Sequence, residues 1–159
     1  MEEMAKESAA RRDEAPIHIV LYQPEIAANV GAVGRTCVGV GAKLWLVRPL
    51  GFQIDDRKLK RAGLDYWPEL DWEAVDDWSA LLRRMAETKG VDDPEADFYY
   101  FTKKATRDYD AVSYRRGDVF VFGPESRGLR IPIRPQIRSL NLSVSVAVAS
   151  FEARRQLRF

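Results

Sequence analysis

The stretch of sequence that decides the fold runs from residue 118 to residue 157. It begins DVFVFGPESRGL (118–129), continues RIPIRPQIRSLNLS (130–143) and ends VSVAVASFEARRQL (144–157). The run VFVF at 119–122 is β-branched and aromatic, and it stops at Gly123. A short continuous apolar run of this kind is typical of a strand buried in a parallel sheet. We therefore predict an α/β fold with a mostly parallel sheet flanked by helices.

The pattern after Gly123 predicts a ligand site. A further strand is predicted at residues 131–133, and a polar loop then opens a helix that begins near Leu142, with Asn141 or Ser143 as its cap. Small residues follow the first strand, which lets a ligand approach the backbone closely. Because ligands of open α/β sheets bind outside the carboxyl ends of the strands, we expect both loops to face one crevice.

The rest of the chain alternates between strand and helix patterns. Strands are predicted at residues 17–22, 43–47 and 98–102, a basic loop at 103–107, and helices at 26–40, 56–62 and 78–88. Residues 1–15 are rich in charge and poor in apolar side chains, so we expect a disordered tail before a single domain at 16–159. His18, inside the first strand, is expected to be a structural residue with a hydrogen-bond partner.

Composition narrows the classes of protein to consider. The 159 residues are 46% hydrophobic and 31% charged, which is ordinary for a soluble globular domain. No apolar run in the sequence approaches the ~18 residues of a membrane span. A single histidine and a single cysteine, Cys37, argue against a metal site and an internal disulfide, and they agree with a reducing cytoplasm. The net charge of +1 does not by itself indicate a nucleic-acid partner.

Four motifs in order resemble those of the SPOUT superfamily of RNA methyltransferases. They are NVGAVGRTC (29–37), DDRKLKRAGLDY (55–66), FGPESRGL (122–129) and SLNLSVSVAVASFEARRQ (139–156). The second motif is similar to that of the tRNA (cytidine/uridine) 2′-O-methyltransferases that act on the wobble nucleotide of certain leucine tRNAs. The resemblance covers about residues 17–157. It implies a deep C-terminal trefoil knot, S-adenosylmethionine as cofactor, tRNA as substrate and a homodimer.

The resemblance also assigns the cofactor site. The family's contacts fall on Phe101, Gly123, Ile131 and Ser139, which belong to strand ends and the loops after them. Backbone groups at strand ends can hold the adenine and methionine parts of the cofactor. An alternative is that Phe101 and Ile131 are core residues only.

Arg35 is the predicted catalytic residue, because the resemblance implies an essential arginine there, sometimes described as the proton acceptor. A guanidinium has a pKa above about 12 and is a poor base, so we expect it to grip a phosphate and to stabilise the developing alkoxide. Glu125 is expected to orient Arg35, with capping of a loop as the alternative. Asn29 and Asn141 match family positions and suit hydrogen bonds to the ribose or to the methionine carboxylate, although Asn141 also suits a helix cap.

The RNA-binding residues and the substrate each allow more than one interpretation. We assign the basic cluster Arg57, Lys58, Lys60 and Arg61 to RNA phosphates, and its alternative is a solvated surface. The leading function is methylation of the wobble ribose of tRNA. The alternatives are 2′-O-methylation of another tRNA or rRNA nucleotide, and a catalytically inactive RNA-binding domain of the same fold.

The junction at Leu129 and Arg130 is shorter than the resemblance leads one to expect. A strand that returns to lie parallel to its neighbour needs a connection of about a dozen residues, and similar proteins carry roughly that many more here. Three explanations for this short junction are open. The connection is naturally short, it was shortened by an engineered deletion, or a segment is absent and the residues on either side of it are numbered consecutively. We favour the third, because both flanks match without further gaps, and it predicts that Leu129 and Arg130 are far apart.

Overall fold

The computed structural model of the chain describes residues 15–54, 65–123 and 128–159. The predicted tail and the predicted helix at 56–62 lie outside the described residues, apart from residue 15. The predicted sheet is confirmed, since seven strands form one sheet in the order β3-β2-β1-β6-β4-β7-β5 and every neighbouring pair is parallel. The strands are β1 Ile17–Tyr22, β2 Lys43–Val47, β3 Trp72–Val75, β4 Phe98–Phe101, β5 Arg107–Asp108, β6 Asp118–Phe122 and β7 Leu129–Arg130.

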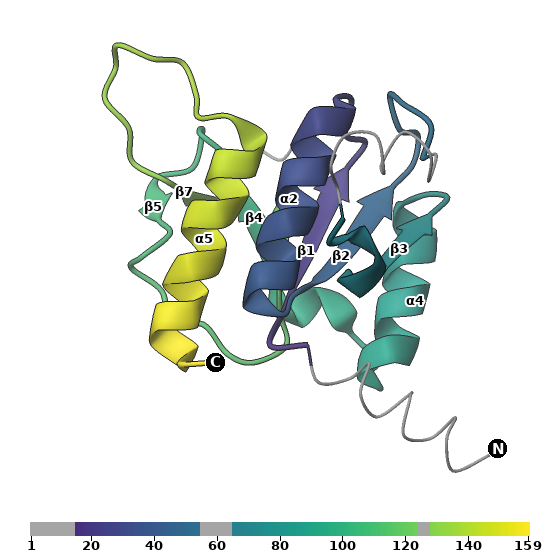
Figure 1. Ribbon diagram of the computed structural model, residues 1–159. Helices are drawn as coiled ribbons and strands as arrows, with labels where there is room; N and C mark the ends of the chain where they lie inside the picture. Colours follow the sequence, from purple (N-terminus) through teal and green to yellow (C-terminus); the bar gives the residue numbers. More distant parts are fainter. Residues whose placement is uncertain (1–14, 55–64, 124–127) are drawn as a thin grey trace, which may run out of the picture.

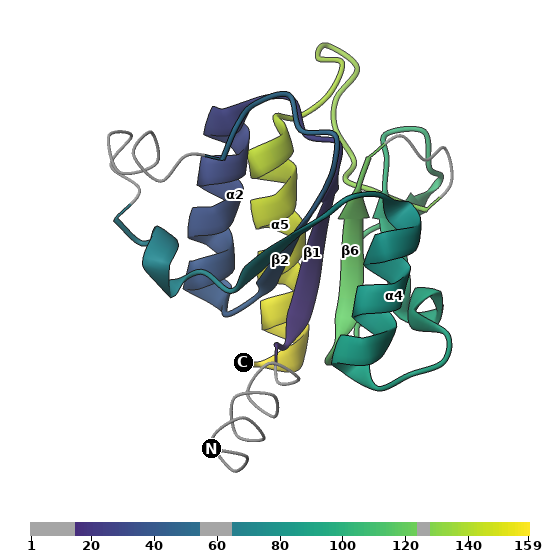
Figure 2. The ribbon, with the colours of Figure 1, turned by 90° about the vertical axis from the view of Figure 1, so that its right-hand side faces the viewer.

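Helices cover both faces of this sheet. They are α2 Ala27–Val40, α4 Trp78–Lys89 and α5 Leu142–Leu157, with short 3-10 turns η1 Trp67–Glu69 and η2 Pro94–Asp97. Helices α2 and α5 lie side by side on one face and α4 lies on the other (Figures 1 and 2). The predicted start of the last helix at Leu142 is confirmed, with Asn141 as the N-cap that accepts a hydrogen bond from the Ser143 backbone N–H.

Alternating side chains of β1 fill two separate cores, one on each face of the sheet. Ile17, Ile19 and Leu21 face α2 and α5, whereas Val20 belongs to the core beneath α4. All four are almost completely buried. Burial on both faces explains why the central strands read as continuous apolar runs.

His18 is the polar exception in β1, and the prediction of a structural histidine is confirmed. Its side chain is 2% exposed, and its Nδ1 accepts a hydrogen bond of 3.1 Å from Trp45 Nε1. Burial, together with the charges of Lys89 and Lys43, lowers the pKa of His18 to about 3. The imidazole is therefore neutral in the folded protein at every pH at which the fold is expected to be stable.

The His18 pKa predicts a stability that falls in acid. Between pH 6.5 and about 3 the unfolded chain binds one proton more than the folded chain, so the free energy of unfolding should decrease as pH decreases. Between pH 7 and pH 4 this amounts to about 3 kcal/mol. Urea unfolding of the wild type and of His18→Asn, whose amide oxygen can still accept from Trp45, measures it. The variant should lose less stability over this interval, and parallel pH profiles would contradict the assignment.

The structure corrects the position of the last strand. Residues 131–133 are not a strand, because β7 is Leu129–Arg130. The Leu129 carbonyl accepts from the Thr102 N–H at 2.9 Å, and the Arg130 carbonyl accepts from the Tyr109 N–H at 2.8 Å. Pro132, in contrast, has no N–H to donate to a ladder. Arg107, predicted to lie in a loop, instead belongs to β5 and pairs with β7.

The expectation of an absent segment at Leu129–Arg130 is wrong. The two residues form one continuous strand. Phe101 of β4 pairs with both Phe122 of β6 and Leu129 of β7, so β7 lies at the carboxyl edge and does not run the length of the sheet. β6 and β7 lie on either side of β4, about 10 Å apart for two strand spacings, and this distance can be spanned by six residues.

The path of β7 bears on the expected knot. β7 lies between β4 and β5, both of which precede it in the chain. The segment that leads from β6 to α5 is thus inserted between earlier parts of the chain. The trefoil knot itself stays a prediction.

Candidate active site

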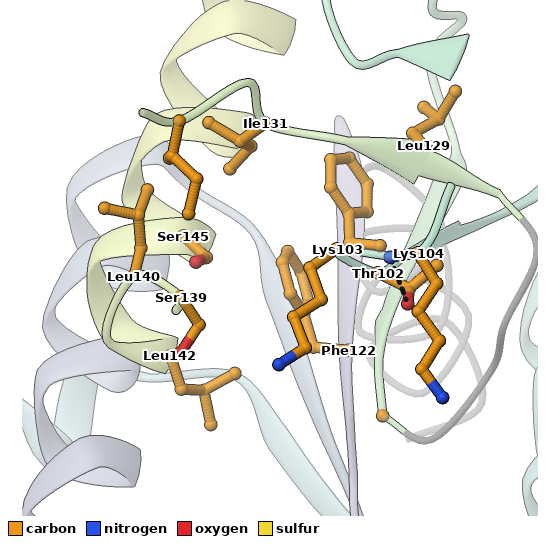
Figure 3. A pocket seen from close by; sticks show the side chains of 13 residues that line it. Thr102, Lys103, Lys104, Phe122, Leu129, Ile131, Ser139, Leu140, Leu142 and Ser145 are labelled. Atoms are coloured by element: carbon orange, nitrogen blue, oxygen red, sulfur yellow. Dashed lines mark hydrogen bonds between the residues drawn. The ribbon is translucent and has the colours of Figure 1, made fainter. Parts of the chain in front are cut away.

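A cavity of about 410 Å³ opens at the carboxyl edge of the sheet, where the sequence predicted a crevice. Its walls come from the ends of β4 and β6, from β7, from the loop 131–141 and from the first turn of α5 (Figure 3). The described lining residues are Phe101, Thr102, Lys103, Lys104, Phe122, Gly123, Leu129, Ile131, Ile133, Ser139, Leu140, Leu142 and Ser145. Apolar side chains dominate, with three hydroxyls, two amino groups and no carboxylate among these residues.

The structure brings all four predicted cofactor residues to this cavity. Phe101, Gly123, Ile131 and Ser139 line it, although they come from widely separated parts of the sequence. Phe101 is only 7% exposed and stacks on Phe122 with ring centroids 4.8 Å apart. Its ring is therefore both core and cavity wall, so the two readings of this residue are compatible. Binding of the cofactor by these residues stays a prediction.

Asn29 and Asn141, 112 residues apart in sequence, meet at the start of α2 and α5. The Asn141 side-chain N–H donates to Asn29 Oδ1 at 3.1 Å. Asn141 Oδ1 in turn accepts from the Ser143 backbone N–H at 2.8 Å and from the Ser143 hydroxyl at 2.6 Å. The cap reading of Asn141 is thus confirmed, and the cap also fixes Asn141 against Asn29. Both side chains lie beside the helix turn that carries the cavity residues Leu142 and Ser145.

Arg35 does not enter the cavity of its own chain. It is exposed on α2, with its guanidinium 5.9 Å from the centroid of the Tyr66 ring. The Tyr66 hydroxyl donates to the Gly31 carbonyl, one turn earlier in α2. Burial raises the pKa of Tyr66, and the positive charge of Arg35 opposes this shift. Tyr66 therefore ties the end of the second motif to the helix that carries Arg35.

Close packing explains one of the small residues of α2, Gly34. A Cβ at Gly34 would lie 2.9 Å from the Trp67 ring and 3.2 Å from Leu70. Trp67 is 8% exposed and sits in the same core as α2. The small face is thus needed, at least at Gly34, to seat η1 against the helix.

Several predicted residues cannot be placed. Glu125 and the basic cluster Arg57, Lys58, Lys60 and Arg61 lie outside the described residues. Conversely, Lys103 and Lys104 line the cavity but are not among the residues predicted for the site. They directly follow the end of β4, and a position after a strand end, next to the predicted cofactor residue Phe101, could have identified them.

The described part of the chain bears on two further expectations. Within residues 15–54, 65–123 and 128–159, no group of three or more His, Cys, Asp or Glu side chains is arranged to hold a metal ion. Among the helices of these same segments, none has the length and apolar character that crossing a membrane requires.

Comparison with known proteins identifies relatives along most of the chain. The model of the SpoU rRNA Methylase family matches residues 16–151. Proteins named tRNA (cytidine(34)-2′-O)-methyltransferase from Burkholderia pseudomallei (strain 1106a) and Methylovorus glucosotrophus (strain SIP3-4) are 42% and 41% identical. The matches cover 89% and 87% of this chain and 96% and 94% of those proteins.

A solved structure agrees with the sequence comparison. It comes from work on the 2-OH methylation of C/U34 on tRNA, and it superposes with a TM-score of 0.75 at 41% identity, over 89% of this chain and 96% of that one. The 156-residue match to the Burkholderia protein is longer than the 89% of this 159-residue chain that it covers. That relative therefore has residues without a counterpart here, in agreement with the short connection to β7. The chain belongs to the SpoU rRNA methylase family.

Proposed function

We propose that this protein transfers a methyl group from S-adenosylmethionine to the ribose 2′-hydroxyl of nucleotide 34, a cytidine or uridine, in tRNA. Leucine tRNAs are the expected substrates. The observation that carries the proposal is the cavity at the carboxyl edge, where the four predicted cofactor residues meet in a chain of this family. Its relatives of 41–42% identity are named for the same reaction.

The cavity has the size and chemistry for this cofactor. Its volume of about 410 Å³ lies within the range of small-molecule sites. Phe101, Leu129 and Ile131 offer apolar walls for an adenine ring, and the hydroxyls of Ser139 and Ser145 offer hydrogen bonds to the polar parts. When bound, S-adenosylmethionine supplies an electrophilic methyl group on a sulfonium. The protein has to position the ribose hydroxyl in line, and positioning alone can supply about 7–11 kcal/mol.

Arg35 is the group that we assign to the reacting ribose. Its guanidinium forms two parallel hydrogen bonds to a phosphate oxygen pair, which fixes the nucleotide, and its positive charge stabilises the developing alkoxide. Glu125 is assigned to hold Arg35 in orientation. The Asn29–Asn141 pair, 3.1 Å apart, is assigned to the ribose or to the methionine carboxylate.

We further propose that the protein acts as a homodimer through α2 and α5. Large apolar side chains are exposed at the start of α2 and along α5, with Ile26 58%, Val144 46% and Phe151 55% exposed. Arg35 is exposed on α2 as well, away from the cavity of its own chain. A partner docked on these faces would bury the apolar surface and bring a second Arg35 within reach of the site. The compartment that we assign is the cytoplasm, where tRNA is the partner.

A methylation assay with mapped products tests the function. Purified protein is incubated with S-adenosylmethionine and unmodified leucine tRNA transcripts, and nuclease fragments are weighed by mass spectrometry. The expected product carries one methyl group on the ribose of nucleotide 34, and a 2′-deoxy nucleotide at this position should abolish transfer. A methyl group on a base or at another nucleotide would refute the proposal. Failure to bind S-adenosylmethionine in calorimetry would favour the inactive RNA-binding alternative.

The basic cluster at 57–61 gives a separate prediction. Changing Arg57, Lys58, Lys60 and Arg61 together to alanine should weaken tRNA binding and flatten its dependence on salt. Each phosphate contact that is lost reduces the number of counterions that binding releases. The measurement is a plot of log affinity against log salt concentration for the wild type and the variant. Superimposable plots would mean that the cluster is only a solvated surface.

A further inference from the structure

Two segments that include the carboxyl ends of β4 and β7 contain basic residues but no acidic ones. Between residues 98 and 107, and between 129 and 151, the sequence contains no aspartate or glutamate. The same segments contain six cations, which are Lys103, Lys104, Arg107, Arg130, Arg134 and Arg138. In a chain with a net charge of +1, this separation of charge marks one end of the molecule.

The basic residues lie on two sides of the cavity. Lys103 and Lys104 follow β4 and line one side, while the loop 131–141 forms the other with Ile131, Leu140 and Ser139 (Figure 3). This loop rises beyond the carboxyl ends of the strands in both ribbon views (Figures 1 and 2). In this loop Arg134 directly follows Ile133 and Arg138 directly precedes Ser139, and both Ile133 and Ser139 line the cavity. The sequence therefore places cations next to both sides of the cavity.

Within the part of the chain that the structure describes, most of these cations have no acidic partner. Arg130 forms an ion pair with Asp108 at 2.7 Å. Lys103, Lys104, Arg134 and Arg138 are exposed, and none of the four has an ion pair with another described residue. Ile137, between the two arginines of the loop, is 52% exposed. An exposed apolar side chain between two arginines suits single-stranded RNA, which presents both phosphates and the faces of unstacked bases.

We propose that the substrate RNA enters as a single strand that crosses the cavity mouth between these two basic sides. Lys103 and Lys104 contact phosphates on one side of the target ribose, and Arg134 and Arg138 contact phosphates on the other. We call these four basic residues at the cavity mouth the rim. The proposal rests on the proposed function, since a 2′-hydroxyl can reach the cavity only if its flanking phosphates pass the rim. Arginine grips a phosphate through two parallel hydrogen bonds, and lysine acts as a point charge. The contacts are thus independent of sequence and position the strand.

Binding of a labelled anticodon stem-loop RNA, measured by fluorescence anisotropy over about 0.05–0.2 M KCl, tests the rim. One variant combines Lys103→Gln with Lys104→Gln, and another combines Arg134→Gln with Arg138→Gln. Each should lower the slope of log affinity against log salt by about 1.4, which corresponds to about 25-fold weaker binding at 0.1 M salt. In the arginine variant, the affinity for S-adenosylmethionine, measured by calorimetry, should change by less than about twofold, because Arg134 and Arg138 do not line the cavity.

A matched control removes two exposed arginines away from the rim, Arg83 of α4 on the opposite face and Arg158 after α5. Its slope should equal that of the wild type. An unchanged slope in either rim variant, or a wild type that does not bind the hairpin, would overturn the proposal. So would a lysine variant that loses only cofactor affinity, since the lysines would then belong to the methionine carboxylate. If the wild type binds the RNA through the rim but methylates no tRNA, the proposed function fails and the rim proposal stands.

Discussion

Replacing Arg35 by alanine should lower kcat/KM for methyl transfer by at least about 100-fold, the typical effect of removing one group that stabilises developing negative charge. The affinity for S-adenosylmethionine should stay within about threefold, because Arg35 is not among the residues that line the cavity. Initial rates at saturating cofactor and at tRNA concentrations well below KM measure the first quantity, and calorimetry measures the second.

Two further variants separate a catalytic role of Arg35 from a merely charged surface. Arg35→Lys keeps the charge but loses the planar fork, so it should recover little of the activity if the arginine grips a phosphate through two bonds. Arg83→Ala, an exposed arginine on the opposite face, should behave as the wild type. An Arg35→Ala protein that keeps a tenth or more of the wild-type kcat/KM would show that the assignment is mistaken.

The long elements could be predicted because their information is local. The continuous apolar runs of β1, β2 and β6 reflect burial on both faces of the sheet, and Asn141 marks the start of α5 by capping it. β7 could not be located in the same way. It has two residues, and its position is set by hydrogen bonds from Thr102 and Tyr109, which lie far away in sequence. Strand propensity at 131–133 therefore pointed to the wrong residues.

The same limit explains the error at the junction. The expectation of a missing segment assumed that β7 runs the length of the sheet, as β6 does. Pairing of Phe101 with both Phe122 and Leu129 shows instead that β7 only extends the carboxyl edge. The number of residues between two strands limits how far their connection can reach. It does not show how far along the sheet, in the strand direction, the next strand begins.

The site was predicted in part, for a physical reason. The resemblance named Phe101, Gly123, Ile131 and Ser139, and the topology explains why they meet, because residues at and after strand ends gather at one edge of a parallel sheet. The place of Arg35 does not follow from that rule. It lies on the exposed side of α2, with its guanidinium 5.9 Å from the centroid of the Tyr66 ring.

Gly128 directly precedes β7, and its conformation determines how closely β7 and the cavity wall approach β4. Its φ is +140°, a conformation that side-chain-bearing residues rarely adopt. A Cβ at this position would lie 2.0 Å from the Tyr100 carbonyl oxygen and 2.8 Å from its carbon. These are backbone atoms of β4, so no rotation of a side chain can relieve the overlap. The adjacent Leu129 is 2% exposed and forms part of the cavity wall.

Gly128→Ala should therefore destabilise the protein by about 3 kcal/mol or more, since backbone strain costs about 1–3 kcal/mol and the overlap adds to it. Affinity for S-adenosylmethionine should fall as well, because β7 has to move away from β4 and takes Leu129 with it. Urea unfolding and calorimetry on the same preparation measure the two effects.

Gly39→Ala is the matched control. A Cβ at Gly39 of α2 meets nothing within 4 Å, so this variant should gain about 0.5–1 kcal/mol from helix propensity. If Gly128→Ala unfolds at the wild-type urea concentration, β7 does not pack against β4 as described, and the cavity wall would have to be built differently.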